Sequence, residues 1–264
     1  MVDINFYTIH IADSTDRENL PGFITMQPPK RAARGRENDL LVALITLKGP
    51  ASISSESLRT WMEKKCEEYF QTPGTVTFAM RTLMEKVNQE LLQRNLKRAA
   101  GGSQLTALMN LVIIKRDQLY LANAGDTRSF YISAQDCTEY RDDEEPGDLG
   151  LVETPHIRFG QKLIQENDLL LLAPVVPATW TAEAFAGGNS LSIEGLSRLL
   201  FNRAEENLRA LVMKFIPGNG GLVTQALKRD MSATRLPDSA YFTAVSEPQE
   251  TEPVQTQEEI APAV

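Results

Sequence analysis

One stretch of the sequence is apolar over the whole length of a single strand. It is residues 39–47, which read DLLVALITL. Strands that alternate polar and apolar residues bury one face, whereas an unbroken apolar run of this length is typical of a strand buried on both faces. The chain therefore needs packing elements on both sides of this strand.

Two amphipathic helices are predicted after this strand. Ser54 or Ser55 can cap a helix that runs to about Phe70, and its apolar residues fall three and four positions apart. After a break at QTPGT, the same spacing recurs from Val76 to Leu91 in a second, longer helix. The methionines at these positions indicate core packing.

Strand-like segments surround these two helices. The predicted strands are residues 1–11, 22–27, 39–47, 105–114, 119–124, 128–132, 157–164, 168–172 and 240–245. Further helices are predicted at residues 181–185, 192–215 and 222–229. Strands that are joined by short turns pair antiparallel. This order predicts an α/β (α+β) fold, a four-layer αββα sandwich in which helices flank two central antiparallel sheets.

The last residues differ in composition from the rest of the chain. Residues 247–264 are rich in Pro, Glu and Gln and contain few large apolar side chains. Such a segment buries too little apolar surface to offset the entropy lost on ordering. We expect residues 1–246 to form one domain and residues 247–264 to form a disordered acidic tail.

Charge and cysteine content limit the classes of partner and compartment. The formal net charge is −8, which disfavours a nucleic-acid-binding protein because phosphate recognition needs a basic surface. Neither Cys66 nor Cys137 lies in a disulfide or metal-binding pattern, so both are expected to be reduced thiols. No signal-peptide pattern and no apolar stretch of membrane-spanning length occurs, so we expect a cytoplasmic protein that does not bind membranes.

Two short sequence motifs lie close together in the middle of the chain. Residues 102–107 read GSQLTA, and residues 119–129 read LYLANAGDTRS. They are similar to the Gly-x-Thr-Ala strand and the Ala-Asn-x-Gly-Asp-Ser-Arg hairpin of the PPM-type, or protein phosphatase 2C-like, metal-dependent phosphatases. Weaker similarities lie at residues 168–173, DLLLLA, and at Asp238. The resemblance spans residues 9–245 and implies a PPM-type phosphatase-like domain.

The resemblance does not extend to the metal ligands. In that family, a Glu-Asp pair, an Asp-Gly-x-Gly-Gly turn, a Ser-Asp-Gly turn and a late Asp-Asn pair hold two divalent metals. Residues 46–50 read TLKGP where the first turn is expected, so Thr46 replaces a carboxylate, and Lys48 adds a positive charge. Residues 174–176 read PVV where the second is expected, so Val175 replaces another. Two adjacent cations need several converging carboxylates, so we expect neither a metal site nor catalytic residues.

A few carboxylates remain as residual metal candidates. They are Asp126, Asp238 and Asp39, which could hold at most a weakly bound hydrated cation. The early Glu-Asp element is matched either by residues 17–19, REN, or by residues 36–39, REND. The sequence does not decide between these two segments.

The bend at GDTR is interpreted as a scaffold. We expect the Asp126 side chain to accept backbone hydrogen bonds and Arg128 to form an ion pair or to lie along nearby apolar surface. If a binding surface exists, we expect it in the former cleft around Thr46, Lys48, Asp126 and Pro174, and Arg128 is a further binding candidate. A second candidate surface is the basic loop of residues 30–36, which ends at Arg36.

These observations favour a pseudophosphatase that works by binding. The expected partner is a protein, for example a phosphoprotein, a kinase or an active phosphatase, and no cofactor is expected. The alternative is an active metal-dependent protein Ser/Thr phosphatase that holds manganese or magnesium in a rearranged site. Its ligands would be Glu18 or Glu37, with Asp39, Asp126 and Asp238.

Two hydrolase classes are less compatible with the sequence. An N-terminal-nucleophile hydrolase needs a processed nucleophile, and Thr46 within a buried apolar run is a poor cleavage site. A Ser-His-Asp triad would use His10 or His156, but neither accompanies a nucleophile-elbow motif. Both histidines are therefore expected to be structural.

Overall fold

A computed structural model describes residues 2–49, 53–98, 104–141, 147–202 and 207–229. All of these belong to one compact unit, Met1–Arg229. Asp238, the strand predicted at residues 240–245 and the tail predicted at residues 247–264 lie outside the described residues. None of the helices within the described residues is long and apolar enough to cross a membrane.

The first of two sheets, sheet A, has the strand order β12-β1-β11-β10-β7-β8, and β2 pairs with the end of β1. Its strands are β1 (Val2–Ala12), β2 (Thr15–Asp16), β7 (Arg128–Ile132), β8 (Cys137–Tyr140), β10 (Leu169–Ala173), β11 (Leu208–Pro217) and β12 (Leu222–Ala226). The pairs within this sheet are antiparallel, except that the edge strand β12 runs parallel to β1.

Sheet B is antiparallel and has the order β3-β4-β5-β6-β9. Its strands are β3 (Phe23–Met26), β4 (Asp39–Lys48), β5 (Thr106–Lys115), β6 (Gln118–Ala124) and β9 (Arg158–Leu163). The unbroken apolar run is the interior strand β4, which is covered on both faces as predicted.

The two long helices lie in consecutive order between β4 and β5. They are α1 (Ser55–Gln71) and α2 (Val76–Arg98). The Ser54 hydroxyl caps α1 by accepting a hydrogen bond from the Ser57 N–H, which satisfies one of the free donors of the first turn. Three short helices follow β10: α3 (Ala182–Phe185), the 3₁₀ turn η1 (Gly188–Ser190) and α4 (Ile193–Phe201).

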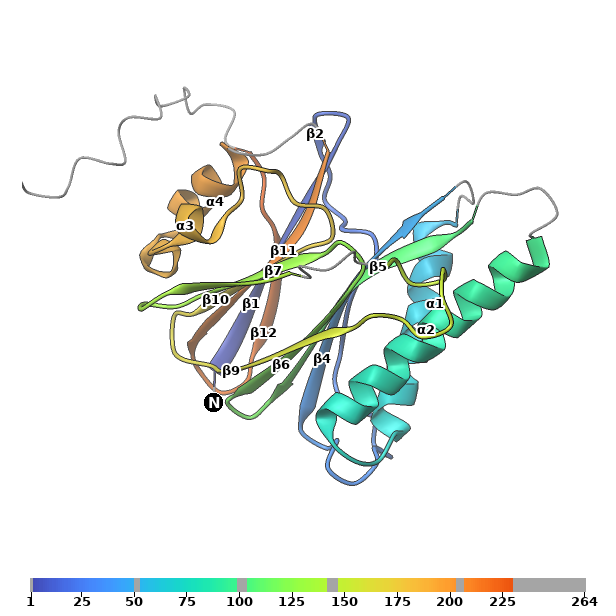
Figure 1. Ribbon diagram of the computed structural model, residues 1–264. Helices are drawn as coiled ribbons and strands as arrows, with labels where there is room; N and C mark the ends of the chain where they lie inside the picture. The colour runs from blue at the N-terminus through green and yellow to red at the C-terminus, as the bar shows by residue number, and fades with distance from the viewer. Residues whose placement is uncertain (1, 50–52, 99–103, 142–146, 203–206, 230–264) are drawn as a thin grey trace, which may run out of the picture. The chain divides into compact units, whose positions relative to one another are not determined.

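Three hydrophobic clusters define four layers. One cluster joins α1 and α2 to sheet B, a second lies between the two sheets, and a third joins α3 and α4 to sheet A. Figure 1 shows α1 and α2 on one side of the paired sheets and α3 and α4 on the other. The structure therefore confirms the predicted four-layer αββα sandwich.

Two predicted helices are wrong. Residues 192–215 contain the short helix α4 followed by the strand β11, and β12 replaces the helix predicted at residues 222–229. Strand β11 lies between β1 and β10 and is buried on both faces. Its residues 208–217 are therefore mostly apolar without period-2 alternation, and such a run is not distinguished from a buried helix by periodicity. The short strands β2 and β8 were not predicted.

Candidate functional site at the strand ends

Several strands end or begin together at one end of the sandwich. Lys48 at the end of β4 is paired with Thr106 at the start of β5, and Ala173 at the end of β10 is paired with Arg128 at the start of β7. The three residues 125–127 join β6 in sheet B to β7 in sheet A at this same end. We call this end of the sandwich, which carries Thr46, Lys48, Asp126 and Val175, the strand-end site.

The sheet B side of the strand-end site contains a hydroxyl and an ammonium group. Thr46 is buried, and its Oγ1 has no hydrogen-bond partner among the described residues. Lys48 Nζ lies 3.2 Å from Asp148 Oδ2, and the Thr106 hydroxyl donates to the same oxygen at 2.9 Å. The charge of Asp148 is therefore compensated by a lysine of the chain itself.

Helix α2 and strand β5 place Asp148. The neighbouring residue Leu149 exchanges two backbone hydrogen bonds with Ala107, at 3.0 and 2.9 Å. The next residue, Gly150, donates its N–H to Asn88 Oδ1 at 2.7 Å and accepts from Asn95 Nδ2 at 2.9 Å. The two asparagines, both on α2, thus hold the segment that brings Asp148 to Lys48.

The bend at Asp126 differs in part from its prediction. The Asp126 side chain is exposed and accepts no hydrogen bond from the described residues, so the expected backbone contacts are absent there. Gly125 has a φ of +76°, and a Cβ at this position would lie 2.5 Å from the Leu108 side chain. Glycine therefore makes this bend possible, because it adopts positive φ freely and has no Cβ.

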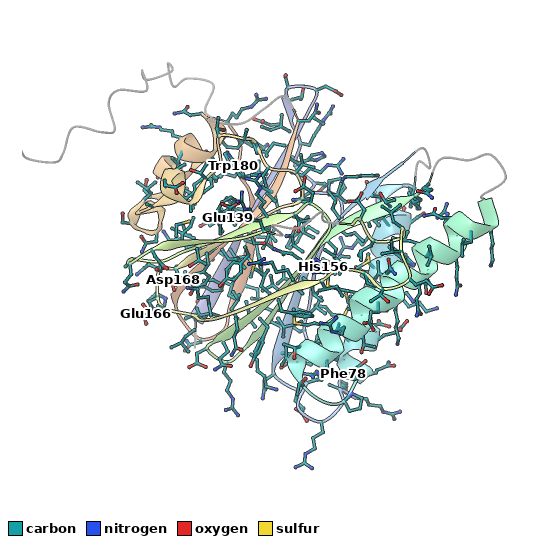
Figure 2. All side chains as sticks on the ribbon, in the orientation of Figure 1. Phe78, Glu139, His156, Glu166, Asp168 and Trp180 are labelled. Carbon is teal, nitrogen blue, oxygen red and sulfur yellow. The ribbon has the colours of Figure 1, made fainter. Side chains whose placement is uncertain are left out.

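The Arg128 side chain lies on the face of sheet A that packs against α3 and α4, not between the two sheets. Its Nη1 lies 3.5 Å from Glu139 Oε1 on β8, so the predicted ion pair is formed with Glu139. Its neighbour at two positions along β7, Phe130, belongs to the cluster beneath α3 and α4, and residues two apart in a strand share a face. Figure 2 shows Glu139 and Trp180 on this same side of sheet A.

The loop of residues 17–22 brings the chain from sheet A to sheet B at this end. The Asn19 carbonyl oxygen lies 2.6 Å from His10 Nδ1, and Glu18 pairs with Lys228 at 3.0 Å. Burial lowers the pKa of His10, and the charges of Arg209 and Arg17 lower it further. Of the two early segments left open by the sequence, residues 17–19 therefore lie at the strand-end site.

The second early segment lies at the other end of the sandwich. Asp39 begins β4 opposite Lys115, seven positions before Thr46, which is about 23 Å along an extended strand. Arg36 Nη1 bonds Asp39 Oδ2 at 2.8 Å, and both side chains are buried. Asp39 and Arg36 are therefore not brought together with Asp126 or Thr46. In the basic loop, Lys30 and Arg34 are exposed, whereas Arg36 is not.

Two site residues were missed by the sequence reading. Asp148 lies in the acidic segment of residues 142–150, which carries none of the motifs named in the sequence analysis. Asn207 directly precedes β11, and its Oδ1 accepts from the Asp13 N–H at 3.1 Å. The preceding residue in the sequence is Glu206, so an acidic residue and an asparagine stand before a central strand. Because residues 192–215 were assigned to one helix, Glu206 and Asn207 were not recognised as residues that precede a strand. Glu206 lies outside the described residues.

The donors at the strand-end site do not fit two divalent metal ions. Within the residues that the structure describes, no group of three or more His, Cys, Asp or Glu side chains is arranged to hold a metal ion. Thr46 and Val175 supply no charge, and Lys48 and Thr106 already occupy Asp148. A pair of hard cations needs converging anionic oxygens, and this set instead presents an ammonium group.

The thiols offer no alternative nucleophile. Burial raises the pKa of Cys66 to about 12, and burial likewise raises the pKa of Cys137 to about 12. The thiolate is the reactive form of cysteine, so both side chains are inert near neutral pH. His156 precedes β9 in sheet B and is exposed, whereas His10 lies in β1 of sheet A.

No family model matches the sequence, and no curated protein matches it. Solved structures do match. The serine/threonine phosphatase of S. agalactiae has a TM-score of 0.57 and 12% identity, with 81% of this chain and 100% of that chain covered. Stp1 from Staphylococcus aureus has a TM-score of 0.57 and 12% identity, covering 83% and 96%. RsbX in complex with magnesium has a TM-score of 0.52 and 12% identity, covering 81% and 100%. At this identity the likeness shows the fold alone.

Proposed function

We propose that this chain, which has the fold of bacterial PPM-type serine/threonine phosphatases, is a pseudophosphatase that acts by binding. Its partner is a protein of phospho-signalling: a phosphoprotein, a kinase or an active phosphatase. The proposal includes neither a metal cofactor nor a hydrolytic step.

The observation that carries this proposal is the charge at the strand-end site. The positions at the ends of β4 and β10, where the resemblance leads one to expect carboxylates, are occupied by Thr46 and Val175. Lys48 adds a positive charge and pairs with Asp148 at 3.2 Å. An ammonium group beside the remaining carboxylate repels a divalent cation and competes for its ligand.

An activity assay with a direct measurement of metal binding tests the proposal. The full chain is expected to hydrolyse neither p-nitrophenyl phosphate nor phosphopeptides in millimolar manganese. Calorimetric titration with manganese is expected to detect no binding tighter than about 1 mM, since too few anionic ligands converge. Metal-dependent turnover that is lost in Asp126→Ala, Asp148→Asn or Asp238→Ala would show that the chain is an active phosphatase.

Restoring the carboxylates should restore metal affinity. The double variant Thr46→Asp, Val175→Asp is expected to bind manganese at least about tenfold more tightly than the unaltered chain, because each carboxylate adds charge and an oxygen ligand. The matched control is Thr46→Asn, Val175→Asn, which has the same shapes without the charge. Equal manganese affinity in the two double variants, measured by calorimetry, would contradict the argument.

One observation favours the alternative, an active phosphatase with a rearranged site. Asp148 is held at the strand-end site by α2 and β5, and the sequence had not indicated it as a ligand. Asp148 and the exposed Asp126 are thus two carboxylates beside Thr46 and Lys48 at this end. Lys48→Ala tests this alternative, because freeing Asp148 would raise manganese affinity and turnover if these carboxylates form a metal site.

A further inference from the structure

A row of polar side chains faces the space between the sheets at the strand-end site. In β1, Ile4 and Phe6 belong to the cluster between the sheets. Residues two apart in a strand share a face, so His10 faces this space. His10 is directly paired with Arg209 at the start of β11.

The same alternation places Arg209 and Thr46 on the faces of their strands that lie between the sheets. Leu211, Met213 and Phe215 of β11 belong to the cluster between the sheets, so Arg209 faces it from sheet A. Val42 and Leu44 of β4 belong to it as well. Thr46 therefore faces the same space from sheet B.

Arg209 is a partly desolvated cation that has no counterion among the described residues. It is half-buried, and burial lowers its pKa. No carboxylate within the described ranges lies at ion-pair distance from its guanidinium, and Arg17 likewise has none there. Removing a charge from water is costly unless an opposite charge accompanies it. Among the described residues this guanidinium therefore has no negative charge beside it, and a bound anion would supply one.

The other charges at this end are balanced or solvated. Lys48 pairs with Asp148, Lys228 with Glu18, and Arg229 with Asp16. The remaining carboxylates among the described residues at this end are Asp13 and Asp126, both of which are exposed. Within the part of the chain that the structure describes, the positive charges without a counterion at this end are thus those of Arg209 and Arg17, beside His10.

Two buried hydroxyl groups at this end also have no hydrogen-bond partner among the residues that the structure describes. Thr46 Oγ1 and Thr127 Oγ1 are buried without a hydrogen bond to any described residue. Leaving a buried hydroxyl unpaired is unfavourable. Thr127 precedes β7, in which Ser129 and Tyr131 alternate onto the face between the sheets. A tetrahedral oxyanion would supply acceptors for these hydroxyls and charge for the guanidinium groups.

We propose that the strand-end site binds a phosphoryl dianion without metal, through Arg209 and Arg17, with His10 beside it and Thr46 as a hydroxyl donor. This inference rests on the proposed function, because it requires that the site hold no pair of metal ions. The bound group is either the phosphate monoester of a phosphoprotein or free phosphate, which share this chemistry.

The two histidines of the chain provide the readout. Inorganic phosphate is titrated into the full chain in EDTA while the ring proton resonances of His10 and His156 are followed by NMR. Sodium chloride at equal ionic strength is the control. Phosphate is expected to shift the His10 resonances and to raise the pKa of His10, since an adjacent anion stabilises the imidazolium form. His156, which precedes β9, is expected to stay unchanged.

Matched variants identify the ligating groups. Arg209→Gln is expected to weaken phosphate binding at least about tenfold, and Arg17→Gln about three- to tenfold, because each removes charge-assisted hydrogen bonds. Arg116→Gln, an exposed arginine after β5 at the opposite end of sheet B, is expected to bind phosphate as the unaltered chain does. Arg17 is exposed, so its variant tests the proposal even if Arg209→Gln does not fold.

Peptides distinguish the two sources of the phosphoryl group. Tighter binding of a phosphoserine peptide than of inorganic phosphate assigns the site to a phosphoprotein, and equal binding assigns it to free phosphate. The inference is overturned if tens of millimolar phosphate leave His10 unshifted in EDTA, or if Arg116→Gln weakens binding as much as Arg209→Gln. Absence of both turnover and phosphate binding would refute this inference alone, whereas manganese-dependent turnover would refute the proposed function.

Discussion

Replacing Arg36 with alanine is expected to lower the free energy of unfolding by about 3–5 kcal/mol, because the buried Asp39 carboxylate loses its closest cation and keeps only Lys115, 3.6 Å away. Arg36 and Asp39 are almost fully buried, and their side chains are joined by a 2.8 Å ion pair. The Arg36 guanidinium also donates to the carbonyl oxygens of Gly74 and Thr75, at 2.7 and 2.6 Å. One side chain thus ties the start of β4 to the turn between α1 and α2.

Thermal unfolding measures this loss. At about 2–4 °C per kcal/mol for a domain of this size, Arg36→Ala should lower the Tm by about 10 °C. The control is Arg34→Ala in the same loop, where the side chain is exposed and the expected change is within about 0.5 kcal/mol. Replacing both members of the pair, as in Arg36→Met, Asp39→Leu, should recover much of the stability, because no fully buried charge remains and Lys115, which also lies near Asp39, is partly exposed. Similar Tm values for the two single variants would contradict this account.

The elements that were predicted correctly are those whose local sequence pattern matches the way in which they are buried. Strand β4 and helix α1 follow from an unbroken apolar run and from a serine cap before an amphipathic stretch, and both begin within one residue of their predicted positions. The later segments fail for a physical reason. Strand β11 is buried on both faces, so its sequence carries no alternation that would separate it from a helix.

The sequence was sufficient to predict which carboxylates the candidate site lacks. It was not sufficient to predict which side chains the site brings together. The absence of carboxylates at Thr46 and Val175 follows from the order of residues along the chain. The pairing of His10 with Arg209 and of Lys48 with Asp148 depends on the register of distant strands and on a loop held by α2. The spacing of these residues in the sequence carries no information about such contacts.

The burial of Arg36 could likewise not be predicted from the sequence. Within a basic loop, an arginine is normally expected to face solvent. The structure instead buries Arg36 because Asp39 lies three positions later and the turn after α1 presents several carbonyl groups. The sequence places the two charges close together but does not reveal the surface of α1 and α2 that covers them.

Replacing Gly22 with alanine tests how tightly the loop over the strand-end site is joined to sheet B. Gly22 has a φ of +78°, and an added Cβ would lie 2.0 Å from the Ile45 carbonyl oxygen of β4. The Gly22 carbonyl oxygen also accepts from the Ile45 N–H at 3.1 Å. Alanine therefore adds backbone strain, a clash with main-chain atoms and a displaced hydrogen bond, for a total loss of more than about 3 kcal/mol.

Gly187 is a matched control for the conformational part of this loss. Its φ is +74°, and no atom lies within 4 Å of the position that a Cβ would take. Gly187→Ala should therefore lose only the cost of a left-handed conformation, about 1–2 kcal/mol. The difference between the two variants in chemical unfolding isolates the contact with β4, one residue before Thr46. Because the same loop carries Asn19 against His10, Gly22→Ala should also shift the His10 resonances, while Gly187→Ala should not. Equal losses of stability with an unchanged His10 would mean that this loop is not anchored through Gly22.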